Sequence, residues 1–100
     1  MRYFSTRDKK LNFSFTEIFS RGLAPDGGLF IPSELKKYSS SELKSLQNLS
    51  YTDLATEIIS SFCSPDLDKQ KLKILVSNAY NNFVTKEVVK IKKIGDIHLL

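Results

Sequence analysis

The sequence has 100 residues with a formal net charge of +4, and 41% of the residues are hydrophobic while 26% are charged. These ordinary proportions exclude a disordered chain, and the length predicts a single domain spanning residues 1–100. The single cysteine, Cys63, and the single histidine, His98, exclude an internal disulfide and a zinc centre built from these residue types. The polar start and the lack of a long apolar run predict neither a signal peptide nor a membrane span, so we expect a soluble, cytoplasmic chain.

The N-terminal part predicts a strand, a polar turn and a short helix. Tyr3–Thr6 is aromatic and β-favouring, and Asp8–Lys10 is the polar turn. Ser14 and Glu17 have the spacing of a capping box, which begins a helix, and Gly22 is placed to end it. The buried stripe of this helix is expected to consist of Phe15, Ile18 and Phe19.

The stretch of residues 22–32, rich in glycine and proline, is the most distinctive part of the sequence. Its turn residues are Ala24, Pro25, Asp26, Gly27 and Gly28. Proline fixes φ, aspartate can bond its own backbone and the glycines admit positive φ, so the pattern predicts a tight turn. The turn leads into a strand over Leu29–Ile31 that Pro32 closes. The backbone N–H groups of such a turn could face a ligand, but the chemistry alone favours a tight connector without one.

The next segment predicts one helical turn and a second short helix. The helical turn falls at Ser33–Leu35. Ser39 and Glu42 form another capping box, which begins the helix. Leu43 and Leu46 are expected to face inward from it.

Two helices of matching periodicity follow. Ser50 and Asp53 begin the first, Cys63–Asp66 interrupts the pattern, and the second begins near Asp68. Apolar residues recur at helical spacing along both: Tyr51, Leu54, Ala55, Ile58, Ile59 and Phe62, then Leu72, Leu75, Val76, Ala79, Tyr80 and Phe83. A short proline-containing connection between two such helices predicts an antiparallel αα hairpin.

The last residues predict a β-hairpin. The apolar period changes to two from Val88, Gly95-Asp96 is a two-residue turn with glycine first, and Ile97–Leu100 is the return strand. The clustered lysines are expected to lie largely on its polar face: Lys86, Lys90, Lys92 and Lys93. Because the sequence stops within a strand, we expect the front of a longer protein or a truncated one. The predicted fold class is α+β, with short strands, two short helices and a packed αα hairpin.

No residues in the sequence have the pattern of a catalytic or metal site. Cys63 ends an apolar helix and is predicted to be a core residue, and His98 is predicted to face solvent. Asp66 and Asp68 are explained better as helix caps than as acid–base groups. Gly27-Gly28 alone is weak support for phosphate binding. The scattered lysines and scarce arginines indicate a solvated surface rather than a nucleic-acid interface.

Five segments, taken in order along the chain, form a recognisable pattern. They are Tyr3 with Ser5-Thr6-Arg7, Ser14-Phe15, Gly22–Pro32, Ser50-Tyr51 with Leu54-Ala55, and Ala79-Tyr80 with Phe83. Together these segments closely resemble the N-terminal domain of the threonine synthase family. The resemblance covers nearly the whole chain, and Gly22–Pro32 is its most specific part.

The resemblance implies an enzyme that uses pyridoxal 5'-phosphate (PLP) to convert O-phospho-L-homoserine and water into L-threonine and phosphate. In that family a catalytic domain follows this one and supplies the lysine that holds the cofactor. It therefore implies that no catalytic or cofactor-binding residue lies within residues 1–100, and that the isolated chain is inactive. The implied partners are the chain's own C-terminal catalytic domain and O-phosphohomoserine, with no metal, nucleic acid or membrane. The loop expected at the active-site mouth, or supporting the neighbouring domain, is Asp26, Gly27, Gly28, Leu29 and Phe30.

Two alternative functions belong to other classes. One is a threonine-synthase-like protein that uses the same N-terminal module on another phosphorylated substrate. The other is a stand-alone basic binding module, which the net charge of +4 suggests. Retention on nucleic acid that falls steeply with salt would support the second alternative.

Overall fold

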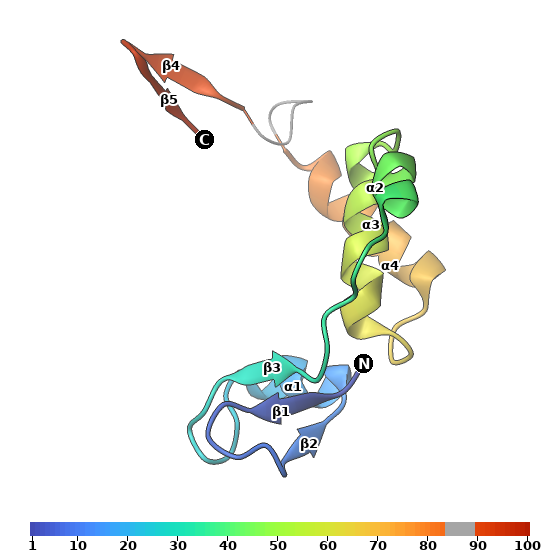
Figure 1. The fold of residues 1–100 in the computed structure, drawn as a ribbon, viewed down its shortest axis with the longest axis vertical. Coiled ribbons are helices and arrows are strands. Elements are labelled where there is room, and N and C mark those ends of the chain that lie inside the picture. Colours follow the sequence, from blue (N-terminus) through green and yellow to red (C-terminus); the bar gives the residue numbers. More distant parts are fainter. Residues whose placement is uncertain (84–89) are drawn as a thin grey trace.

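The computed structural model describes residues 1–83 and 90–100 (Figure 1). The elements are, in chain order, β1 (Tyr3–Ser5), β2 (Asn12–Phe13), α1 (Phe15–Arg21), β3 (Phe30–Pro32), α2 (Ser40–Leu46), α3 (Tyr51–Cys63), α4 (Lys69–Asn81), β4 (Lys92–Ile94) and β5 (Ile97–Leu99). Small antiparallel sheets thus accompany the helices, which confirms the predicted α+β class. None of the helices in the described ranges is long and apolar enough to cross a membrane.

The first three strands form an antiparallel sheet in the order β2-β1-β3. Tyr3 at the centre pairs with Phe13 on one side and with Pro32 on the other. Pro32 is tolerated because β3 is an edge strand, where a missing N–H does not interrupt the ladder. The strands near Tyr3 and Phe30 are confirmed within one residue, whereas β2 was not predicted as a strand.

Helix α1 is held at both ends. The predicted capping box is present, since Ser14 accepts from the Glu17 N–H and the Glu17 carboxylate accepts from the Ser14 N–H. Gly22 ends the helix with φ 75°. The predicted buried stripe is wrong at Phe19, whose side chain is 81% exposed. Periodicity correctly gives a helix, but a helix of 7 residues at the side of the molecule has only part of its apolar face covered.

The segment between β3 and α2 has a bend at Ser33 and no regular structure after it, so the predicted helical turn at Ser33–Leu35 is wrong. The Ser33 N–H donates to the Arg2 carbonyl at 2.8 Å, which ties this residue to the N-terminal strand instead of a helical turn. The capping box of α2 is confirmed. Leu43 is nevertheless 55% exposed rather than inward-facing, whereas Leu46 is half-buried.

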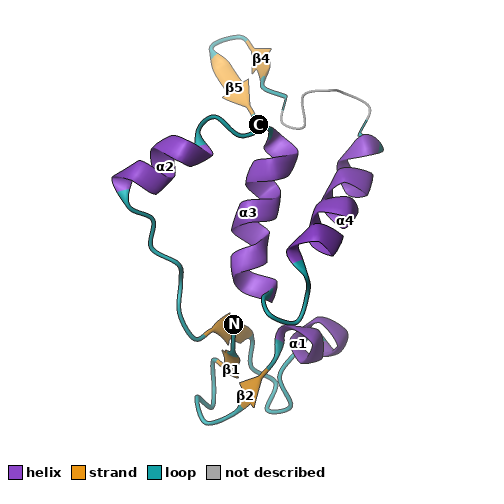
Figure 2. Ribbon diagram, turned by 90° about the vertical axis from the view of Figure 1, so that its right-hand side faces the viewer, coloured by secondary structure: helices purple, strands orange, loops and turns teal. Residues whose placement is uncertain are grey.

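Helices α3 and α4 form the predicted αα hairpin, with α1 beside the turn that joins them (Figure 2). The capping residues Ser50 and Asp68 are where the sequence places them. The core cluster consists of Cys63, Leu72 and Val76, with Phe15, Ala55, Leu67 and Tyr80 packed against it. Some of the apolar residues at helical spacing are nevertheless exposed, namely Tyr51, Ile58, Ile59, Leu75, Ala79 and Phe83. Two packed helices bury only the side chains along their line of contact, so the residues on either side of that line remain exposed to solvent.

The β4–β5 hairpin stands apart from the other elements (Figure 1). The predicted turn is confirmed, with Gly95 at φ 59°. All residues of both strands are exposed. Within β4, Lys92 shares a face with Ile94 while Lys93 lies on the opposite face, and all three residues are exposed. The expected strand start at Val88 lies outside the described residues.

Candidate functional site

The loop predicted as the site is a tight turn that folds back on β1. The Gly27 N–H donates to the Ala24 carbonyl at 2.9 Å, and the Ala24 N–H donates to the Gly28 carbonyl at 3.0 Å. Gly27 has φ 74°, which the sequence predicts, but Gly28 is not in the positive-φ region. The two adjacent glycines therefore serve different purposes.

Gly28 is required by close packing. A Cβ atom at this position would lie 2.2 Å from the Ser5 Oγ and 3.0 Å from the Thr6 Oγ1. Ser5 is fully buried, so it has no room to move aside. The absence of a side chain at residue 28 is what allows the loop to approach β1.

Asp26 is the polar centre of the loop. Its Oδ1 accepts from the Ser5 hydroxyl at 2.7 Å and from the Gly28 N–H at 2.9 Å. Its own carbonyl accepts from the Arg7 Nη1 at 3.0 Å. The Ser5 hydroxyl first, then the Gly28 N–H and the Arg7 charge, hold the pKa of Asp26 below its usual value. The carboxylate is therefore ionised at neutral pH and fixed to β1.

The N–H groups of Gly27, Gly28 and Leu29 in this loop are not available to a ligand. Those of Gly27 and Gly28 are bonded within the loop, and that of Leu29 donates to the Thr6 Oγ1 at 3.0 Å. Leu29 is 61% exposed, whereas Phe30 packs edge-on against Phe13 with ring centroids 5.1 Å apart. The geometry favours the tight-connector interpretation, and what the loop offers to a neighbour is mainly the Leu29 side chain.

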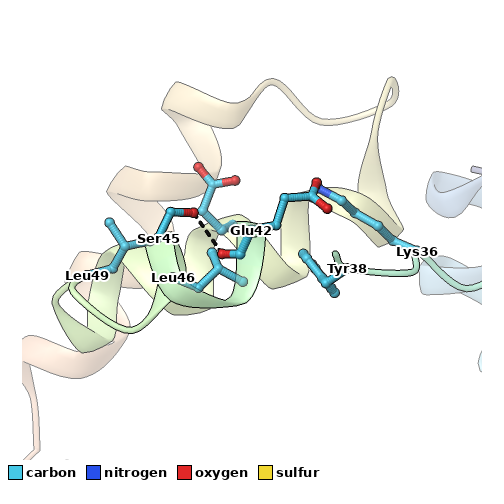
Figure 3. Close-up of a pocket in the computed structure, with 7 residues that line it drawn as sticks. Lys36, Tyr38, Glu42, Ser45, Leu46 and Leu49 are labelled. Carbon is cyan, nitrogen blue, oxygen red and sulfur yellow. Dashed lines mark hydrogen bonds and ion pairs between the residues drawn. The ribbon is translucent and has the colours of Figure 1, made fainter. Parts of the chain in front are cut away.

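A second candidate is a pocket of about 340 Å³ between α2, α3 and the segment before α2 (Figure 3). Lys36 lies 3.8 Å from the Glu42 carboxylate and 4.7 Å from the centre of the Tyr38 ring. The Ser45 hydroxyl donates to the Glu42 carbonyl at 2.7 Å. The Ser39 N–H and hydroxyl lower the pKa of Glu42. These polar groups interact with one another, and no sequence pattern pointed to the pocket because Lys36 and Tyr38 lie in an irregular segment.

The remaining candidates have structural roles. Cys63 is fully buried, its thiol donates to the Ile59 carbonyl at 3.3 Å, and burial raises its pKa. His98 is exposed on β5, whereas Cys63 lies at the end of α3, so the two residues belong to different elements. Asp68 caps α4, and Asp66 accepts from the Thr16 N–H at 3.0 Å, which caps α1. Within residues 1–83 and 90–100, no cluster of three or more histidine, cysteine or acidic residues could hold a metal.

Comparison with known proteins identifies the fold and the family. Residues 2–80 match the family described as threonine synthase N terminus. The chain is 39% identical over 80 residues to the threonine synthase of Methylobacillus glycogenes, and 34% identical over 95 residues to threonine synthase-like 2 of Xenopus laevis. These alignments cover 80% and 94% of this chain but only 17% and 20% of the relatives.

A solved structure agrees with these sequence matches. The fold superimposes on the crystal structure of threonine synthase from Escherichia coli with a TM-score of 0.80 and 22% sequence identity. The superposition covers 93% of this chain and 21% of that one. At this identity the superposition establishes the fold, and the sequence match over residues 2–80 establishes the family. The chain belongs to the threonine synthase N-terminal family.

Proposed function

We propose that this chain is the N-terminal domain of an enzyme that converts O-phospho-L-homoserine and water into L-threonine and phosphate. The observation that carries the proposal is the family match over residues 2–80, together with 39% identity to a protein named threonine synthase. A cytoplasmic location is part of the same proposal.

The activity is proposed for a longer protein, because the chain spans only 17–20% of the length of these curated relatives. The partner of the chain is then its own C-terminal catalytic domain. PLP supplies an electron sink that stabilises negative charge on a substrate carbon. The loop over residues 26–30 does not fit the cofactor's phosphate, since the N–H groups of Gly27, Gly28 and Leu29 are already bonded. In this proposal the remainder of the protein binds the cofactor, and residues 1–100 alone are inactive.

The role proposed for Asp26–Phe30 is to support the neighbouring domain. The hydrogen bonds of Asp26 to Ser5 and Gly28 hold the turn rigidly on β1. This rigidity presents Leu29 at a fixed position, with its side chain 61% exposed. A pre-positioned apolar side chain can pack against a partner with little loss of conformational entropy.

A second candidate function is favoured by the similarity to threonine synthase-like 2, which is 34% identical over 94% of this chain. A protein of this kind would act on another phosphorylated substrate. The N-terminal residues do not separate the two functions, since both kinds of relative match the same segments.

The deciding experiment begins with the reading frame past Leu100. A stop codon directly after Leu100 would overturn the enzyme proposal. If the frame continues, the complete product is purified with PLP and incubated with O-phospho-L-homoserine, and phosphate and threonine are both quantified. Equal amounts of the two products support threonine synthase. If a parallel incubation with another phosphorylated amino acid releases phosphate, and O-phospho-L-homoserine gives no threonine, the second function is supported. The 100-residue chain alone should release neither product.

A further inference from the structure

An apolar groove lies between α1 and α4, close to the turn that joins α3 and α4. Its volume is about 360 Å³. The side chains that form it are mainly apolar: Phe15, Phe19, Leu67, Leu72 and Leu75. It is separate from the loop over residues 26–30 and from the pocket of Figure 3.

The rim of this groove is open to solvent although its floor belongs to the core. Phe15 packs against the core cluster and stacks on Phe19 with ring centroids 6.0 Å apart. Phe19 is 81% exposed and Leu75 is 56% exposed. Two large apolar side chains thus flank a hollow whose inner wall is already packed.

The groove is also held in a fixed shape. The capping box at Ser14 and the positive-φ Gly22 secure the two ends of α1. Asp66 accepts from the Thr16 N–H at 3.0 Å, which ties α1 to the turn before α4. The Asp66 carboxylate at the edge of the groove therefore already accepts a hydrogen bond. The other side chains that line the groove are mostly apolar, so the groove suits an apolar occupant.

We propose that apolar side chains from the remaining part of the threonine synthase chain fill this groove. The inference rests on the proposed function, because the matched relatives extend far beyond the 17–20% of their length that this chain covers. A covalently linked partner is present at millimolar effective concentration when the linkage is short. A second copy of the chain has no such advantage. Exposed apolar patches of this kind commonly mark surfaces that a partner covers.

The test compares two single-cysteine probes in the complete gene product. Leu75→Cys places a thiol at the groove, and Leu43→Cys places one on α2, where leucine has nearly the same exposure in this structure, 55% against 56%. Labelling by iodoacetamide is followed by peptide mass spectrometry at two protein concentrations. Cys63 reports the background because it is fully buried. We expect labelling at residue 75 to be at least about tenfold slower than at residue 43, with the difference lost in denaturant.

Three outcomes would overturn the proposal. Equal labelling rates at residue 75 in the native and in the denatured protein show that nothing covers the groove. Slower labelling at residue 75 that appears only at the higher protein concentration shows that a second copy fills it. A stop codon directly after Leu100 would contradict both the proposed function and the proposed occupant of the groove. Equal rates in an enzyme that is active would contradict the proposed occupant alone. Phe19→Cys repeats the measurement from α1, so a local defect at one position does not decide the result.

Discussion

The two sheets of this molecule show how differently similar turn chemistry can be used. In the sheet β2-β1-β3 the glycine-containing loop packs on the strands, and a Cβ at Gly28 would lie 2.2 Å from the Ser5 Oγ. In the β4–β5 hairpin the turn glycine, Gly95, has nothing within 4 Å of where its Cβ would be. Gly28 is required by the close packing of its neighbours, whereas Gly95 is required only by its own backbone conformation, with φ 59°.

The contrast extends to the strands. Tyr3 and Ser5 of β1 are buried, at 5% and 0% exposure, and Tyr3 reaches α3 by donating to the Phe62 carbonyl at 2.6 Å. All residues of β4 and β5 are exposed. A two-stranded hairpin without further contacts is at best marginally stable in water. The first sheet is therefore integrated with the helices, and substitutions in the two sheets should have unequal effects on global stability.

The largest effect is expected from Gly28→Ala. The new methyl group cannot fit between the loop and the fully buried Ser5, so the loop must move away from β1. We expect a loss of about 3 kcal/mol in the free energy of unfolding, the upper range for overpacking. Urea denaturation followed by circular dichroism measures it.

Gly22→Ala is the matched control for this substitution. Gly22 has φ 75° but open space around it, so alanine there suffers only the backbone penalty, about 1 kcal/mol. Equal losses in the two variants would show that Gly28 is not packed against Ser5 as described.

A smaller effect is expected from Tyr3→Phe. This substitution keeps the buried ring and removes the hydroxyl that donates to the Phe62 carbonyl. The expected loss is about 1 kcal/mol, the net value of one hydrogen bond. Thermal unfolding measures it, with Tyr38→Phe on the segment before α2 as the control. An unchanged melting temperature would mean that the sheet and α3 are not coupled through this bond.

Local chemistry in the sequence was sufficient for much of this fold. The capping boxes at Ser14 and Ser39, and the hairpin turn at Gly95, are confirmed because each depends on residues within one or two turns. The αα hairpin is confirmed because helical periodicity persists through both of its helices. In each case the residues that form the sequence pattern are also the residues that form the structural element, and they lie close together in the sequence.

Contacts between distant segments could not be predicted in this way. Asp66 caps α1 from 50 residues away, and periodicity gave no reason to expect it. Periodicity also identified the apolar face of α1 without showing that Phe19 would be left open. At the candidate loop, the sequence explained both glycines by φ, whereas only the folded contact with Ser5 explains Gly28.

A pH-dependent contribution is expected from Asp26. Its pKa is lowered in the folded state, mainly by the Ser5 hydroxyl, so the ionised form stabilises the fold above the pKa of the unfolded chain. This stabilisation is lost as the pH falls through the lower folded pKa, over roughly pH 5 to 2. The difference in melting temperature between the native protein and Asp26→Asn should therefore shrink with acidification. Glu34→Gln controls for the change in net charge, and a difference that stays constant would contradict the assignment.

The smallest global effect is expected from Gly95→Ala. Alanine at φ 59° carries a local penalty of about 1 kcal/mol, and the exposed side chains of β4 and β5 provide little to offset it. In the 100-residue chain, the cross-strand contact between Lys93 and His98 should weaken in NMR spectra while the melting temperature stays unchanged. Gly95→Asn should retain more of the contact, since asparagine tolerates this backbone region. If Gly95→Ala lowers the melting temperature as much as Gly22→Ala does, the hairpin is coupled to the helices, and the two sheets are less different than their burial indicates.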